Sequence, residues 1–132
     1  MSSSYVGADL RRLVETRAEA LCEYCLIAEA DTFLGCEIDH IISEMHDGPT
    51  QADNLAFACV VCNQAKGSDV GSFHKPTASF VRLFNPRSDL WGKHFQLAGP
   101  RIEAQTPIGH VTAQLLVLMH PSGCLSGQRS LG

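Results

Sequence analysis

Two pairs of cysteines have the spacing of a metal site. Cys22-x-x-Cys25 and Cys59-x-x-Cys62 are two identical motifs separated by 33 residues. Two intervening residues let both sulfurs of a motif reach one tetrahedral ion, and four thiolates leave no position for water. Soft sulfur ligands exclude Mg²⁺ and favour zinc, with iron as the less favoured ion. The spacing predicts a structural zinc site, with a redox-active Cys-x-x-Cys or a pair of disulfides as the alternative.

Between and just after these motifs lie residue types that suit phosphodiester hydrolysis. Asp39 and His40 are adjacent, Asn54 follows fourteen residues after His40, and Asn63 directly follows the last cysteine. The reaction needs a base for the attacking water and a hard cation to neutralise charge on the phosphate. Histidine suits the base, and carboxylate and amide oxygens suit Mg²⁺ or Mn²⁺. Neighbouring side chains on a strand point to opposite faces, so Asp39 and His40 can serve one phosphate only where the strand ends or bends.

The order of these motifs resembles the HNH endonuclease superfamily. Over residues 22–67 the chain reads Cys-x-x-Cys, Asp-His, Asn and Cys-x-x-Cys-Asn-x-x-Lys. The resemblance implies a ββα-metal core, in which the first strand carries the Asp-His pair and the last motif residue lies on the helix. The segment after this core resembles an extension found in small stand-alone bacterial or phage HNH proteins.

The resemblance also implies roles for individual residues. His40 would be the general base, and Asp39 and Asn63 would hold the catalytic Mg²⁺ or Mn²⁺. Asn54 would hydrogen-bond the loop and so fix the direction of His40. The asparagine at position 63 makes this an Asn-type variant of the motif, which favours Mg²⁺ or Mn²⁺ over a tightly held transition ion.

Each assignment has an ordinary structural alternative. Asp39 can be a solvated acid at a strand end, His40 a partly buried histidine, and Asn54 the cap of a turn. The loop residues Glu44 and His46 are ambiguous in the same way. The remaining histidines and cysteines fit no ligand spacing and are interpreted as ordinary side chains: His74, His94, His110, His120, Cys36 and Cys124.

Short elements must position these groups. A helix is expected from Asp9, with Leu10, Val14 and Leu21 on one apolar stripe, ending near residues 22–25. Residues 32–42 favour a strand or tight hairpin and residues 55–61 a second strand. A short helix should run from Cys62 to Lys66 and end at Gly67.

The second half of the chain is expected to add a strand and a helix. Residues 71–77 are expected to form a loop, residues 80–84 a strand and residues 107–119 a helix, with a frayed tail over 121–132. The predicted fold class is α+β, a zinc-stapled ββα-metal (HNH) core with an N-terminal helix and a C-terminal strand-helix extension. We expect one domain over residues 1–132, with the core at about 9–70 and the extension at about 71–120.

Charge is distributed unevenly along the chain. The formal net charge is −4, made of −8 over residues 1–62 and +4 over residues 63–132. An acidic total argues against a nucleic-acid partner, whereas the basic second half leaves a surface for one. The candidates for nucleic-acid contact are Lys66, Arg82, Arg87, Lys93 and Arg101, with Trp91 as a stacking platform or, alternatively, a core residue.

The sequence shows no signal segment at its N-terminal end and no apolar run long enough for a membrane span. Intracellular thiols stay reduced and bind metals more often than they form disulfides. The expected location is therefore the cytoplasm, with no membrane partner.

These observations predict a metal-dependent endonuclease that acts on DNA more readily than on RNA. Two alternatives stay open: a zinc-dependent nucleic-acid-binding module that does not cleave, and a nuclease subunit that depends on a partner for DNA affinity. A protein partner or a homodimer also stays open.

Overall fold

The computed structural model describes residues 5–99 and 101–118. The strands of this part of the chain pair as three antiparallel two-stranded sheets, β1–β2, β3–β4 and β5–β6. The predicted tail and Met119 lie outside the described residues. The elements in chain order are α1 (Ala8–Arg17), β1 (Cys36–His40), β2 (Leu55–Cys59), α2 (Val60–Lys66), β3 (Gly71–His74), β4 (Ser79–Arg82), α3 (Trp91–His94), β5 (Phe95–Ala98), β6 (Arg101–Ala104) and α4 (Pro107–Leu116).

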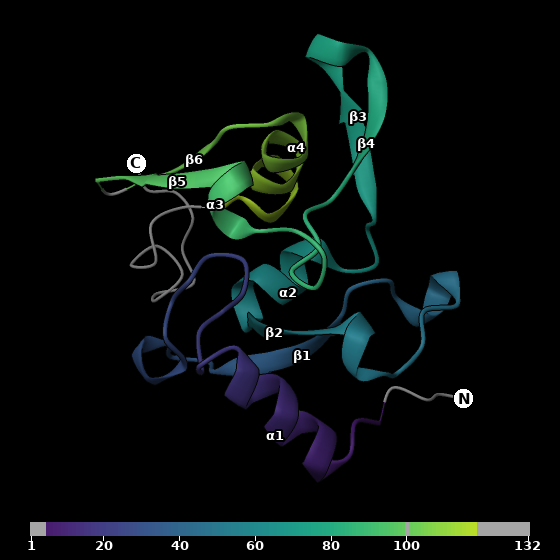
Figure 1. Ribbon diagram of the computed structural model, residues 1–132, viewed down its shortest axis with the longest axis vertical. Helices are drawn as coiled ribbons and strands as arrows, with labels where there is room; N and C mark the ends of the chain where they lie inside the picture. The colour runs from purple at the N-terminus through teal and green to yellow at the C-terminus, as the bar shows by residue number, and fades with distance from the viewer. Residues whose placement is uncertain (1–4, 100, 119–132) are drawn as a thin grey trace.

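A ββα unit forms the centre of the molecule. β1 and β2 pair over five residues, from Cys36↔Cys59 to His40↔Leu55, and α2 follows β2 without a loop. Gly67 ends α2 with φ of 52°, a left-handed value that glycine adopts without a Cβ clash. The predicted order of strand, loop, strand and helix is confirmed. Figure 1 shows α1 on one side of the β1–β2 ribbon and α2 on the other.

Strand β2 is buried along its whole length because both of its faces are covered. Leu55 and Phe57 pack with Val14 of α1 in one small cluster. Ala56 and Ala58, on the opposite face, belong to the larger core that contains the cysteines. Side chains as small as alanine let the following helix lie close over this face.

Helix α1 ends at Arg17, earlier than the predicted end near residues 22–25. Glu19 and Ala20 have φ of 56° and 57°, which no α-helix accommodates. The Arg17 guanidinium donates to the carbonyl oxygens of Ala52 and Leu55, at 2.6 Å each. The end of α1 is therefore fixed to the chain that leads into β2.

The extension contains more strands than predicted. The expectation of a loop over 71–77 is wrong, because β3 and a 3-10 helix, η4 (Lys75–Thr77), lie there. The predicted strand at 80–84 corresponds to β4, which pairs with β3. The β5–β6 hairpin was not expected. Strands of four residues carry too little alternation to stand out in a sequence that is also rich in turn residues.

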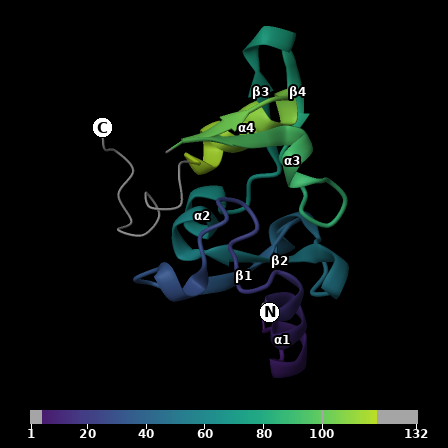
Figure 2. The same cartoon turned by 60° about the vertical axis from the view of Figure 1, so that its left-hand side comes forward.

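The extension and the ββα unit share one hydrophobic core. The cysteines and the aromatic residue Tyr24 pack in the same cluster as side chains from β4 onward, namely Leu83, Phe84, Phe95, Ile102, Val111 and Leu116. Figure 2 shows the extension stacked on the α2 side of the ββα unit. The α+β fold class is confirmed. None of the described helices has the length and apolar character needed to cross a membrane.

Candidate active site

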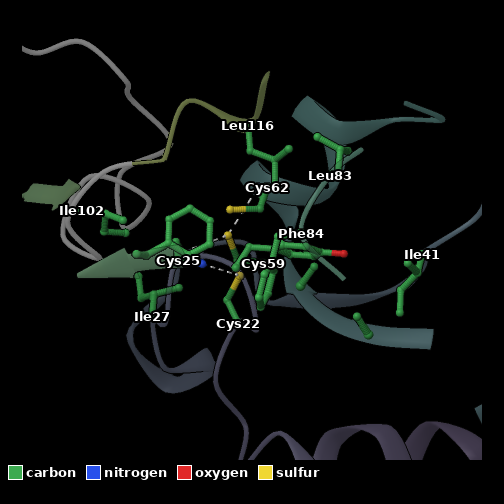
Figure 3. Close-up of a cluster of buried hydrophobic side chains, with 14 of the residues drawn as sticks. Cys22, Cys25, Ile27, Ile41, Cys59, Cys62, Leu83, Phe84, Ile102 and Leu116 are labelled. Carbon is green, nitrogen blue, oxygen red and sulfur yellow. Dashed lines mark hydrogen bonds between the residues drawn. The ribbon is translucent and has the colours of Figure 1, made fainter. Parts of the chain in front are cut away.

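The four predicted zinc ligands converge in the core. Cys22, Cys25, Cys59 and Cys62 are buried, and their sulfur atoms lie within 4.8 Å of one another (Figure 3). The sulfurs of Cys25 and Cys59 are 3.8 Å apart. Four sulfurs that each lie about 2.3 Å from one tetrahedral ion are separated by about 3.8 Å. The cluster indicates a bound metal such as zinc.

Backbone amides support the two motifs. The N–H of Cys25 donates to the sulfur of Cys22, and the N–H of Cys62 donates to the sulfur of Cys59, at 3.4 Å in both cases. Cys36 faces Cys59 across the β1–β2 ribbon but does not belong to the cluster. Burial raises the pKa of the Cys36 thiol far above its usual range, so this residue stays protonated. Cys124 lies outside the described residues.

His40 is the last residue of β1 and is half-buried. Its Nε2 lies 2.9 Å from the hydroxyl oxygen of Thr50, in the loop that connects β1 to β2. Among the described residues, none makes a hydrogen bond to Nδ1 of His40. One ring nitrogen of His40 is therefore held in place by Thr50.

Asn54 ties the loop that surrounds His40. Its side-chain oxygen accepts from the N–H of Ile42, and its amide nitrogen donates to the carbonyl oxygens of Ile42 and Pro49, all at 2.9 Å. Ile42 follows His40 closely, and Pro49 precedes its partner Thr50. The contacts fix both ends of the loop, and the effect of Asn54 on catalysis stays a prediction.

Asp39 lies on the opposite face of β1 from His40 and points toward α2. It is 3 % exposed, and its two oxygens accept hydrogen bonds from the Tyr24 hydroxyl at 2.8 Å and from Nζ of Lys66 at 3.2 Å. Burial raises the pKa of Asp39, while the charge of Lys66 and the hydrogen bond from Tyr24 act in the opposite direction. Asp39 is thus the centre of a buried network that joins the first cysteine motif, β1 and α2.

Lys66 does not belong to a nucleic-acid surface, contrary to its prediction as a phosphate contact. It is 2 % exposed, and its ammonium also donates to the carbonyl oxygens of His40 and Ile41 at 3.1 and 3.0 Å. Those bonds and the ion pair with Asp39 satisfy all three of its N–H groups. The residue stabilises the end of β1 from within the protein.

Asn63 contacts a carboxylate that the sequence did not single out. Its amide nitrogen donates to Oε1 of Glu37 at 2.6 Å. Glu37 is exposed and shares the α2-facing side of β1 with Asp39. No hydrogen bond joins Asn63 to Asp39 in the described part of the chain. Glu37 precedes Asp39 by two positions. Because side chains alternate between the two faces of a strand, this spacing is the signal that would have identified Glu37.

The comparisons with known proteins agree with this arrangement. Residues 22–69 match the family model of the HNH endonuclease. This segment is an HNH endonuclease domain. It begins at the first cysteine and ends between α2 and β3, so it contains the whole ββα unit. A search of curated proteins and a search of solved structures give no significant match to the chain.

The HNH domain supports a nuclease-type function, and nucleic acids are what such domains act on. The extension carries the other four residues predicted to contact nucleic acid, which are Arg82, Arg87, Lys93 and Arg101. The three arginines form ion pairs, which are Arg82–Asp89, Arg87–Glu23 and Arg101–Glu103. Arg82 binds Asp89 through two hydrogen bonds, of 2.8 and 3.0 Å, and holds the pKa of Asp89 below its usual value. Lys93 is exposed and forms no ion pair with any described residue.

Trp91 packs against the core beside the HNH domain. Its indole N–H donates to the Tyr24 carbonyl at 2.9 Å, and its ring lies 5.2 Å from that of Phe95, between centroids. The geometry favours the alternative in which Trp91 is a core residue.

Zinc removal tests the metal centre. We expect the purified protein to hold one zinc ion per chain, and Cys59→Ser to lose that ion and its fold. A structural zinc site contributes on the order of 10 kcal/mol to folding in small domains. Elemental analysis and circular dichroism measure the two effects. Cys36→Ser is the matched control and should keep both zinc and fold; full zinc retention by Cys59→Ser would contradict the assignment.

The buried ion pair is tested by a double-mutant cycle. Lys66→Met should lower the free energy of unfolding by about 3–5 kcal/mol, because it leaves the Asp39 carboxylate buried without its cation. The double variant Asp39→Asn/Lys66→Met should recover most of this loss, since it removes both charges. Urea unfolding of the zinc-loaded proteins measures the effect. Additive losses in the double variant would show that the two side chains do not interact.

Proposed function

We propose that the chain is a metal-dependent endonuclease that hydrolyses phosphodiester bonds of DNA, with His40 as the general base. The observation that carries this proposal is the placement of His40 within the HNH domain. It stands where β1 ends, with one ring nitrogen on Thr50 and the other without a hydrogen bond from any residue that the structure describes. A base must be both oriented and accessible to take a proton from water.

The divalent cation of such an enzyme needs oxygen ligands. Glu37 and Asn63 offer a carboxylate and an amide beside each other, outside the buried core, and this donor set fits Mg²⁺ or Mn²⁺. Asp39, which the sequence pairs with Asn63, holds Lys66 instead and would become a ligand only after that ion pair opens. We therefore propose Glu37 and Asn63 as the protein ligands, bound once the Asn63 amide turns its oxygen to the position that its Nδ2, the donor to Glu37, now occupies. A cation bound there would neutralise charge on the phosphate and on the leaving oxygen.

The other residues of the site position these groups. Thr50 and Asn54 hold the ring of His40 and the loop around it. Lys66 holds the carbonyl groups of His40 and Ile41, so it fixes the backbone where β1 ends. The extension shares the core of the HNH domain, which favours a single working unit over residues 1–132.

A partner-dependent nuclease subunit is the second candidate. The HNH domain has nine acidic residues and one lysine or arginine, which is the buried Lys66. Phosphate binding needs exposed cations, so the domain by itself has little affinity for DNA. A partner that supplies this affinity would make up for the deficit.

Plasmid cleavage tests the nuclease. Zinc-loaded protein with added Mg²⁺ or Mn²⁺ should convert supercoiled plasmid to nicked or linear forms. His40→Ala should lose at least about 100-fold in rate, the range that general-base catalysis contributes. The control is Gln96→Ala, an exposed residue on β5 of the extension, which should cleave as the parent does. Equal cleavage by His40→Ala would overturn the assignment of the base, and no cleavage by folded parent protein would favour the partner-dependent subunit.

Direct binding of Mn²⁺ tests the cation ligands. Glu37→Gln should weaken Mn²⁺ binding about tenfold or more, because it removes the exposed carboxylate, and electron paramagnetic resonance of free Mn²⁺ measures this without any cleavage. The matched control is Glu44→Gln in the neighbouring loop, which should bind as the parent does. Unchanged affinity in Glu37→Gln, with loss in Asp39→Asn that keeps its zinc and fold, would restore Asp39 as the ligand.

A further inference from the structure

The β3–β4 hairpin extends beyond the rest of the extension. In both views it projects past α4, with η4 at its tip (Figures 1 and 2). The pairing from Gly71↔Arg82 to His74↔Ser79 divides its side chains between two faces. We call the face that carries Gly71, Phe73, Phe80 and Arg82 the aromatic face.

The other face of the hairpin is attached to the protein. His74 is buried, and its ring stacks on that of His110 of α4 at 5.6 Å between centroids, with 16° between the planes. Val81 packs against the main core. The hairpin is therefore held in position by this face, while Phe73 of the aromatic face borders a cavity that it shares with His110 and Gln114 of α4.

Two phenylalanines dominate the aromatic face. Phe73 and Phe80 stand directly opposite each other, and they are 61 % and 65 % exposed. The ring of Phe80 lies over Gly71, where a Cβ would come within 2.6 Å of the ring carbon Cζ. The absence of a side chain at Gly71 gives the ring this place on the strand. Paired aromatic rings left in water mark an interaction surface.

The charge around this face is positive. Residues 70–88 contain Lys75, Arg82 and Arg87 and no acidic residue. Arg82 and Arg87 are neutralised by ion pairs, whereas Lys75, exposed at the tip, forms none with any described residue. Flat apolar rings beside an unpaired cation suit a ligand that has both aromatic rings and negative charge, which is the chemistry of a nucleic acid with unpaired bases.

The aromatic face also begins close to the proposed catalytic residue. A cavity of about 60 Å³ is lined by Arg82 from the base of the hairpin and by Ile41 and Ile42, which follow His40. The HNH domain offers no exposed lysine or arginine of its own to hold a polyanion. The hairpin is the next element after this domain and carries the exposed Lys75.

We propose that the aromatic face binds unpaired bases of the nucleic-acid substrate by stacking on Phe73 and Phe80, while Lys75 contacts the phosphate backbone. This inference rests on the proposed nuclease function and names its substrate class, a nucleic acid with a single-stranded or opened segment. Fully paired DNA keeps its bases stacked inside the duplex and offers no face to these rings.

Binding measured without cleavage tests the proposal. Fluorescence anisotropy of a labelled single strand and of the matching duplex is followed with zinc-loaded protein and no added divalent cation. The parent should prefer the single strand, and Phe73→Ala/Phe80→Ala should weaken single-strand binding about tenfold or more. Leu97→Ala, an exposed aliphatic residue on β5, is the matched control and should bind as the parent does.

The salt dependence separates stacking from charge. Phe73→Ala/Phe80→Ala should leave the slope of log affinity against log salt unchanged, whereas Lys75→Ala should reduce its magnitude by about 0.7. Unchanged single-strand affinity in the folded double variant, with cleavage by the parent intact, overturns this inference alone. No nucleic-acid binding and no cleavage by the parent overturn the proposed function as well. Self-association of the parent that the double variant abolishes would assign the aromatic face to a dimer interface and overturn the proposal.

Discussion

Four sulfur atoms within 4.8 Å of one another hold together the two chain segments on which the site depends. The first segment contributes Tyr24, between two of the cysteines, and its hydroxyl binds Asp39. The second continues into α2, where Asn63 and Lys66 follow the last cysteine. A metal ion held by the four cysteines would join the Tyr24 segment to the junction of β2 and α2, and so would help to bring Tyr24 and Lys66 to the two oxygens of Asp39.

The buried Lys66 ammonium determines which oxygens remain for a cation. It neutralises Asp39 at 3.2 Å and binds two carbonyl groups at the end of β1. A divalent ion at Asp39 would lie beside a like charge in a region of low dielectric, which is strongly unfavourable. Glu37 is exposed and Asn63 of α2 contacts it there, so this pair lies outside the buried ion pair of Asp39 and Lys66. The hydrogen bonds of Lys66 therefore stabilise the end of β1. The groups that remain for a cation are the proposed ligands nearer the surface, Glu37 and Asn63.

The parts of the site that depend on local spacing were predictable from the sequence. The cysteine motifs, the two strands and the helix that ends at Gly67 all follow from patterns within a few residues. Burial of Lys66 was not predictable, because its partner Asp39 is 27 residues away and the pairing depends on how α2 packs. The short strands of the extension were missed for a related reason, since a four-residue strand is specified mainly by its tertiary contacts. Glu37 could have been identified from the sequence, because it lies two positions before Asp39 and strand alternation places both carboxylates on one face of β1.

The distribution of charge gives the extension a physical role. The HNH domain is strongly acidic and its single lysine is buried, so electrostatics alone would repel a phosphate chain from the proposed catalytic face. Among the described residues, the exposed lysines Lys75 and Lys93 both come after this domain in the chain, whereas the exposed Arg11 precedes it on α1. The β3–β4 hairpin places one of them, together with two exposed aromatic rings, on an arm fixed to the same core. The salt dependence of nucleic-acid binding comes from contacts to phosphate, whereas stacking on aromatic rings contributes affinity through the bases. An acidic nuclease that binds its substrate through the bases therefore needs fewer phosphate contacts than one that binds through the backbone.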